Sequence, residues 1–255
     1  LATGMFAPVY PALAQQLVQD YGLSDGVYVD VGGAEGSLAM ELAKRTRATV
    51  YVVDLDPAAV RLCNLLADEA KLTGRVRAIE GDAQNLPLRD GFADLVVSRN
   101  SLFQWPDKIA GIKEAYRILK PGGLLAFTFH HSEDAPWVSV LESLFDAGFY
   151  LQATYPVRSD ETKGTGQFGS KMIEYDIIHV CRKRLEDPSP ISWARLRRRI
   201  TDDVRQLRGI LEQHKAGGLP KADLQVIRRG KALEYFSKHY GHVYVEKGRN
   251  FTLRE

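Results

Sequence analysis

The stretch "VYVDVGGAEGSLAMELA", from Val27 to Ala43, decides the fold of this chain. An apolar run ends in a glycine-rich turn, and a helical pattern with Leu38 and Leu42 on one face starts immediately after the turn. A turn between a strand and the following helix directs backbone N–H groups and the positive end of the helix toward a ligand. The stretch therefore predicts a loop that binds a nucleotide-like molecule.

Segments typical of strands and of helices alternate around this loop, from about 27 to 184. We expect strands at 26–31, 48–55, 75–82, 92–98, 123–131, 149–157 and 175–183, and helices at 37–45, 57–72, 106–119 and 135–147. Short connections between them predict an α/β fold of three layers, with helices on both faces of a mostly parallel, seven-stranded, Rossmann-like sheet. Only a glycine-rich loop joins the last two strands, so we expect an antiparallel strand at one edge. The "KPGG" sequence at 120–123 predicts a helix end and a turn before the next strand.

A linker-like "EDPSP" at 186–190 divides the chain into two predicted parts. Residues 1–185 are expected to form the α/β domain, and residues 186–255 a small, basic and mostly helical C-terminal extension. The basic segment 195–208 could contact the phosphates of a nucleic acid through Arg195, Arg197, Arg198, Arg199, Arg205 and Arg208. Asp202, Asp203 and Glu212 interrupt the run, as in an ordinary solvated helix face, and both interpretations stay open.

The composition excludes several classes of protein. The 255 residues are 45% hydrophobic and 26% charged with a net charge of +2, so the total charge does not indicate a nucleic-acid or membrane protein. No apolar run is long enough to span a bilayer, and the first residues lack the pattern of a signal peptide. Cys63 and Cys181 lack the spacing of metal ligands and are expected to be buried and reduced. We therefore expect a cytoplasmic protein with no metal site and no membrane contact, and leave the oligomeric state open.

The glycine loop does not match the common phosphate-binding loops. If Gly32 is the first glycine of a dinucleotide motif G-x-G-x-x-G, Ala34 and Ser37 occupy the other two glycine positions. The Gly-Lys-Ser/Thr ending of a P-loop is also absent. A ligand whose phosphates rest on this loop is therefore not expected.

Acidic residues follow three successive strands instead. Asp30 precedes the glycine turn, Asp54 ends the second strand, and Asp82 ends the third. In folds of this class, a carboxylate after the second strand binds ribose hydroxyls. Three such acids favour a ligand that has a ribose, an adenine amino group and an amino-acid part, and no phosphate.

Five motifs in order, "VDVGGAEG", "VYVVDLDP", "EGDAQNLPL", "FADLVVSRNSL" and "EAYRILKPGG", carry a family resemblance. Over roughly 5–184 the sequence resembles the class I S-adenosylmethionine-dependent methyltransferases. The resemblance implies S-adenosylmethionine as the cofactor and a loop around its methionine part, formed by Asp30, Gly32, Gly33 and Gly36. The sequence departs from the family pattern at Ala34, where the middle glycine is usual. A methyl group there is tolerable unless the position needs a positive φ.

The same resemblance implies roles for residues of the later motifs. Asp54, with Leu55 beside it, would accept hydrogen bonds from the ribose hydroxyls. Asp82 would take the adenine amino group, next to the backbone of Ala83. Ser98 would line the floor of the site beside the sulfonium.

Methyl transfer from a sulfonium is a direct displacement, which needs a general base only if the acceptor must lose a proton. Asn100 is a candidate catalytic residue beside the acceptor. His130 and His131 are the candidate bases, and because neighbouring strand residues point to opposite faces, at most one of them faces the acceptor. A surface or hydrogen-bonded histidine is the other interpretation of each.

A second resemblance bears on the acceptor. It rests on "FTFHHSEDAPWVSVLESLFDAGF", "YPVRSDE", "IIHVCRKR" and "LPKADLQVIRRGKALEYFSKHYGHVYVEKG". Through these segments, over roughly 127–255, the chain is similar to a group of adenine-specific DNA methyltransferases. Those enzymes need an Asp/Asn-Pro-Pro-Tyr motif after the fourth strand to hold the flipped base. Here that position reads Ser98-Arg99-Asn100-Ser101. A small-molecule methyltransferase is therefore our first hypothesis. A nucleic-acid methyltransferase or a nucleic-acid-binding relative is the second, and a cofactor-binding module without catalysis is the third.

Overall fold

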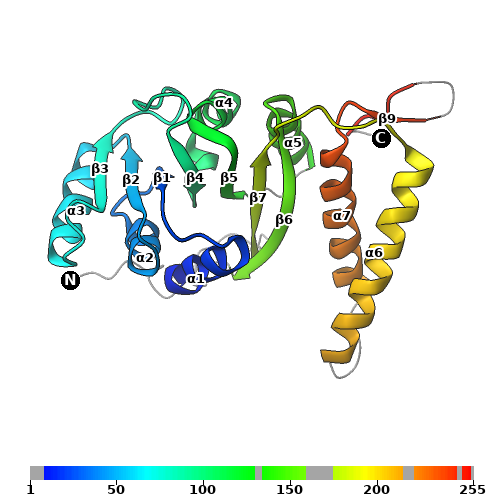
Figure 1. The fold of residues 1–255 in the computed structure, drawn as a ribbon, viewed down its shortest axis with the longest axis horizontal. Helices are drawn as coiled ribbons and strands as arrows, with labels where there is room; N and C mark the ends of the chain where they lie inside the picture. The colour runs from blue at the N-terminus through cyan, green and yellow to red at the C-terminus, as the bar shows by residue number, and fades with distance from the viewer. Residues whose placement is uncertain (1–8, 130–133, 159–174, 215–220, 246–248, 254–255) are drawn as a thin grey trace, which may run out of the picture.

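The computed structural model describes residues 9–129, 134–158, 175–214, 221–245 and 249–253. Its main sheet has seven strands in the order β3-β2-β1-β4-β5-β7-β6 (Figure 1). The strands are β1 (Val27–Val31), β2 (Thr49–Asp54), β3 (Val76–Glu80), β4 (Ala93–Ser98), β5 (Leu119–Phe129), β6 (Phe149–Arg158) and β7 (Tyr175–Lys183). All seven lie at the predicted places, and the apolar runs of β1, β4 and β5 are buried as strands covered on both faces should be.

Helices cover both faces of the sheet and give the predicted three layers. The helices of the α/β domain are α1 (Val9–Tyr21), α2 (Ser37–Arg45), α3 (Pro57–Glu69), α4 (Lys108–Ile118) and α5 (Asp134–Asp146), with a short 3-10 turn at Leu102–Gln104. Buried side chains of α1, α2 and α3 share one core with the sheet, and those of α4 and α5 share the other. Helix α1 was not among the predicted helices, and it packs through Leu13, Ala14 and Leu17.

One strand runs against the others, as the missing helix between the last two strands predicts. β7 pairs antiparallel with both β5 and β6, so it lies between them and β6 forms the edge. The expected turn at "KPGG" needs correction. The strand already starts at Leu119, and its pairing with β4 shifts from Ala93↔Leu119 to Leu95↔Leu124. The proline and glycines therefore form an irregularity inside β5 instead of a separate turn.

The C-terminal part is mostly helical, as predicted. It contains α6 (Trp193–His214) and α7 (Lys221–Lys238), with a parallel pair of two-residue strands, β8 (Ile191–Ser192) and β9 (Val243–Tyr244). Leu196, Ile200 and Val204 of α6 form a small core with Phe236 of α7. Figure 1 shows α7 beside β6, with α6 outside it. None of the described helices is long and apolar enough to cross a bilayer.

The contact between α7 and β6 includes a buried polar link. The Ser237 hydroxyl, which is fully buried, accepts a hydrogen bond from the Leu151 amide at 2.8 Å. The Arg184 guanidinium donates to the Ser237 carbonyl at 2.6 Å. Leu233 and Tyr240 also pack against the core on the α4–α5 side of the sheet. The predicted boundary at 185/186 therefore separates two segments that share packing, and as a domain boundary it stays a prediction.

Candidate active site

A cavity of about 520 Å³ opens at the carboxyl ends of β1 and β2 and reaches the loops after β3 and β4. Eight residues predicted to act in the site line it: Asp30, Gly32, Gly33, Asp54, Leu55, Asp82, Ala83 and Asn100. Gly36 and Ser98 do not line it, and His130 and His131 lie outside the described residues. The cavity therefore brings together residues that the sequence separates by as much as 70 positions.

Two glycines of the loop are required by their backbone and their surroundings. Gly32 has φ 68°, and a Cβ there would lie 1.8 Å from the Ser101 hydroxyl. Gly36 has φ 78°, and a Cβ there would lie 2.4 Å from the Cys63 sulfur. Because L-residues with a side chain rarely adopt positive φ, both positions accept only glycine without rearrangement. Gly36 thus shapes the loop without touching the cavity, since it packs α2 against α3.

Ala34 also adopts a positive φ, of 47°. The turn therefore needs a left-handed backbone at this position, where the methyl group of alanine is unfavourable. The Ala34 amide donates to an oxygen of Asp54 at 2.8 Å. This hydrogen bond holds the glycine loop against the end of β2.

Asp30 is the most perturbed acid of the cavity. It is 2% exposed and accepts a hydrogen bond from the backbone amide of Ala39, in the first turn of α2. Gly36 is the N-cap residue of this helix, but it has no side chain that could accept a hydrogen bond from the first helical amides. Burial, and then the charges of Asp54 and Glu35, raise the pKa of Asp30 to about 7. Asp30 therefore both caps α2 and places a titrating carboxyl in the cavity.

Asp54 is held by two backbone amides at the end of β2. One carboxylate oxygen accepts from Ala34 at 2.8 Å, and the other accepts from Asp56 at 3.0 Å. Asp56 in turn caps α3 by accepting from the Ala58 amide at 2.8 Å. Each oxygen of Asp54 keeps a further lone pair for a ligand hydroxyl.

Asp82 lies in the loop after β3, which ends at Glu80. Its carboxylate accepts from the backbone amide of Gln84 at 2.9 Å and from the Gln84 side-chain amide at 3.1 and 3.2 Å. The Gln84 side-chain oxygen accepts from the Asp107 amide at 2.7 Å, at the start of α4. Gln84 thus links Asp82 to a helix 25 residues further along the chain.

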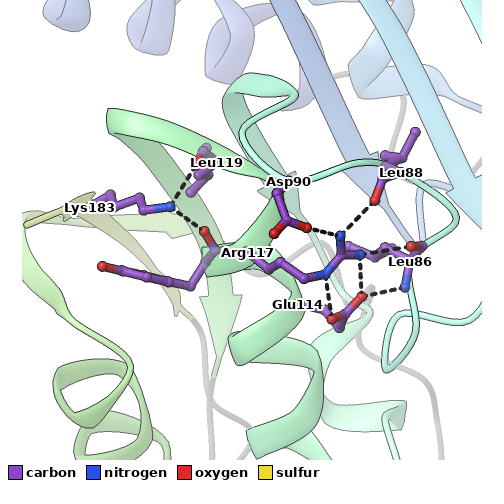
Figure 2. A network of polar contacts seen from close by, with 8 residues as sticks. Leu86, Leu88, Asp90, Glu114, Arg117, Leu119 and Lys183 are labelled. Carbon is purple, nitrogen blue, oxygen red and sulfur yellow. Dashed lines mark hydrogen bonds and ion pairs between the residues drawn. The ribbon is translucent and has the colours of Figure 1, made fainter.

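Arg117 of α4 fixes the rest of this loop (Figure 2). Its guanidinium donates to the carbonyls of Leu86 at 2.9 Å and Leu88 at 2.8 Å, and pairs with Glu114 and Asp90, each at 2.7 Å. Glu114 also accepts from the Leu86 amide at 2.8 Å. Hydrogen bonds to Glu114 and then Asp90 raise the pKa of Arg117, and the bond to Arg117 lowers the pKa of Glu114 despite its burial. The loop that carries Asp82 is therefore clamped to α4 by a charged side chain.

The side of the cavity near the end of β4 contains the residues expected beside an acceptor. Asn100 has φ 53°, a conformation in which asparagine is enriched, and its amide donates to the Thr128 hydroxyl at 2.9 Å. The Ser101 hydroxyl accepts from the Trp105 indole at 2.9 Å. Ser98 is 1% exposed and lies beneath the cavity, in a small void with Leu38 and Phe127. Its role beside the ligand stays a prediction.

Sequence reasoning missed several lining residues, among them Glu35, Gln84 and Arg99. The Arg99 guanidinium is buried and lies 4.8 Å from the ring centre of Tyr10 in α1. Arg99 lies inside the motif "FADLVVSRNSL", two residues before Ser101, and this position could have indicated that it lines the site. Glu35 and Gln84 each lie within two residues of a predicted site residue.

The charge of the cavity restricts its ligands. Among the described residues that line it, five are acids and one, Arg99, is a base; the acids are Asp30, Glu35, Asp54, Asp56 and Asp82. Such a lining favours a cation and the hydroxyl and amino groups that donate hydrogen bonds, and it opposes phosphates. Among the described residues no group of three potential metal ligands is placed to hold a metal ion.

Residues 29–127 match the family model of the methyltransferase domain. This segment is therefore similar to known methyltransferase domains. Over 96 residues the chain is 38% identical to 2-methyl-6-phytyl-1,4-hydroquinone methyltransferase of Arabidopsis thaliana, covering 37% of this chain and 27% of that protein. It is 36% identical over 118 residues to erythromycin 3''-O-methyltransferase of Saccharopolyspora erythraea, covering 45% of this chain and 38% of that protein. The chain thus spans well under half the length of these curated relatives.

Solved structures share the fold of the α/β part of the chain. The structure described as a putative S-adenosylmethionine-dependent methyltransferase from Methanococcus maripaludis superimposes with a TM-score of 0.59 at 22% identity. The match covers 72% of this chain and 90% of that one. Together with the strand order, it confirms the predicted class I methyltransferase fold.

Proposed function

We propose that this chain binds S-adenosylmethionine in the acidic cavity and transfers its methyl group to a small-molecule acceptor. The observation that carries the proposal is the convergence of Asp30, Asp54 and Asp82 on one cavity beside the glycine loop. These donors fit the cofactor, because the cavity offers acceptors for hydroxyl and amino groups and negative charge for a cation. S-adenosylmethionine supplies an electrophilic methyl group bound to a sulfonium.

The residues of the chain position the two reactants. Asp54 accepts the ribose hydroxyls, with the Ala34 and Asp56 amides holding its carboxylate in place. Asp82, steadied by Gln84, takes the adenine amino group. Asp30 provides negative charge near the amino-acid part. Asn100 borders the acceptor side, where the acceptor must lie in line with the methyl group.

Two further findings support a small acceptor. The curated relatives reported above are named for a hydroquinone and for erythromycin, which are small molecules. Ser98-Arg99-Asn100-Ser101 follows β4 and has neither the prolines nor the aromatic ring that hold a flipped adenine.

Calorimetry with S-adenosylhomocysteine tests the cofactor site. We expect one site per chain, with Asp54→Ala losing most of the affinity and Asp54→Asn losing less, since the amide keeps one oxygen acceptor. Asp25→Ala is the matched control, because Asp25 is an acid paired with Arg47 and does not line the cavity. The absence of binding by the parent chain, or equal binding by Asp54→Ala, contradicts the proposal.

Turnover is tested separately, with radiolabelled S-adenosylmethionine and a panel of phenols, hydroquinones, sugars and amines. Transfer to any of them supports the proposed reaction. Cofactor binding without transfer to any compound of a wide panel favours the non-catalytic module instead.

One observation supports the second hypothesis, a nucleic-acid methyltransferase or nucleic-acid-binding relative. The arginines of the basic segment are all exposed on α6, on the surface away from its buried Leu196–Ile200–Val204 stripe. Methylation of a DNA or RNA oligonucleotide, with binding that weakens steeply as salt rises, would favour this function. Weak, salt-insensitive binding of oligonucleotides would remove it.

A further inference from the structure

A second cavity, of about 460 Å³, lies between the α/β domain and the C-terminal extension. It is bordered by Tyr150 of β6, by Arg182, Lys183 and Arg184 at the end of β7, by the linker, and by Lys238 of α7. Because β7 runs against its neighbours, its carboxyl end lies at the sheet edge opposite the carboxyl ends of β1 and β2. This cavity is therefore separate from the acidic one.

The strand geometry directs two guanidiniums to the same side. Arg182 and Arg184 are two residues apart, and alternate residues of an extended chain share a face. Tyr150 is the direct cross-strand partner of Arg182, so its ring lies on that face as well. Lys183 between them points the other way, with its ammonium on the carbonyls of Tyr116 and Leu119 at the end of α4 (Figure 2).

Neutral oxygens hold both arginines in place. Arg182 donates to the Gln152 side chain and the Gly122 carbonyl, each at 2.8 Å, and Arg184 donates to the Ser237 carbonyl at 2.6 Å. A guanidinium has five N–H donors, so each keeps several for a ligand. Within the described residues, neither forms an ion pair with a carboxylate.

The positive charge of the cavity is only partly offset. Lys238 pairs with Glu234 at 2.7 Å, and Glu186 is the acid that lines the cavity. Burial lowers the pKa of Arg184, although the charge of Asp187 opposes this effect. Keeping this cation partly buried therefore has an electrostatic cost that a bound anion would remove.

We propose that this cavity, which we call the seam cavity, binds the phosphate group of a small molecule. Two guanidinium forks suit a phosphate, because each fork donates paired hydrogen bonds to its oxygens and their two positive charges match a dianion. The ammonium of Lys238 adds a further hydrogen-bond donor. The volume is within the usual range for small-ligand pockets. Tyr150 and the stems of the linker residues provide apolar contact for the organic part.

Titration calorimetry of the full chain with inorganic phosphate tests the proposal, against sodium chloride of equal ionic strength. We expect saturable binding at one site, unchanged when S-adenosylhomocysteine is present in excess. Because the ligands occupy different cavities, failure of one site leaves the result for the other unaffected. Adenosine monophosphate, titrated with S-adenosylhomocysteine in excess to fill the acidic cavity, is the second probe. Tighter binding than phosphate indicates that the organic part is recognised too, and equal binding indicates that the phosphate group alone is.

Lys238→Met and Arg184→Gln should each weaken phosphate binding about tenfold, the usual effect of removing one charge-assisted hydrogen bond. Arg197→Gln is the matched control, because Arg197 is an exposed arginine of α6 away from the cavity. The urea midpoint of each variant verifies folding. No saturable phosphate binding up to about 20 mM, or equal affinity in Lys238→Met and the parent, overturns the proposal.

Discussion

Replacing Asp30 with asparagine should make the protein without ligand more stable and its cofactor site weaker. The asparagine keeps an oxygen for the Ala39 amide and removes the charge. In the folded chain the pKa of Asp30 is about 7, against 3.8 for a free aspartate. Each pH unit between these values contributes about 1.4 kcal/mol, so the ionised carboxylate lowers the free energy of unfolding by about 4 kcal/mol above pH 7.

The sign follows from proton binding. Between pH 4 and 7 the folded chain holds a proton on Asp30 that the unfolded chain has lost, so the stability of the parent falls as pH rises through this window. The Asp30→Asn variant lacks this loss. The free energy of unfolding of the variant should exceed that of the parent by little near pH 4. The difference should grow by about 2 kcal/mol between pH 5.5 and pH 8, because about 1.5 pH units of that interval lie below the pKa of Asp30 in the folded chain.

Urea unfolding of parent and variant at pH 5.5 and pH 8, followed by circular dichroism, measures this difference. Calorimetry at pH 8 should show S-adenosylmethionine binding about tenfold more weakly to the variant, because a negative charge opposite a cationic ligand is gone. An advantage that is the same at both pH values would refute the burial argument. A variant that is less stable than the parent at pH 8 would refute it as well.

Three more predictions concern the loop, the clamp and the sheet edge. Ala34→Gly should raise the free energy of unfolding by about 0.5–1 kcal/mol, because relief of a left-handed alanine exceeds the added chain entropy; a lower urea midpoint would contradict the positive φ. Arg117→Met should lower the free energy of unfolding by about 2–3 kcal/mol and weaken adenosine binding, because the loop of Asp82 loses its contacts with α4. Glu114→Gln is the control and should have a smaller effect. Unchanged adenosine affinity in calorimetry would show that the Arg117 contacts do not affect the cofactor site. Ser237→Ala should lower the free energy of unfolding, measured by thermal unfolding, by about 1–3 kcal/mol, because the Leu151 amide loses its buried hydrogen-bond partner. An unchanged stability would mean that another group forms a hydrogen bond with this amide.

Features that depend on neighbouring residues could be predicted from the sequence. The strands follow from their apolar runs, and the Asp56 cap follows from the proline beside it, because both arise within a few residues. The position of Asp54 and Asp82 at one cavity could be predicted because the ends of adjacent parallel strands must meet at one edge of the sheet. Their roles toward a ligand stay predictions. The left-handed backbone of Ala34 could not be foreseen, since alanine rarely adopts it and the surrounding turn imposes it.

Long-range contacts explain most of what the sequence did not predict. The carbonyl of Leu86 is 31 positions from Arg117, and no local pattern links the two. The burial of Asp30, and with it the raised pKa, depends on the packing of α2 over β1. The seam cavity also required the structure, because it forms only where α7 returns to β6 near the start of the linker.

The Ser237 link has a consequence for the behaviour of the protein in a crowded solution. β6 is the edge strand, and an edge strand presents unpaired amides and carbonyls to which another chain can add. Ser237 occupies the outward amide of Leu151, and α7 packs along the strand. The C-terminal helices therefore cover the β6 edge and oppose aggregation through it. In a chain shortened to residues 1–185, we expect this edge to be exposed and able to pair with a strand of a second molecule.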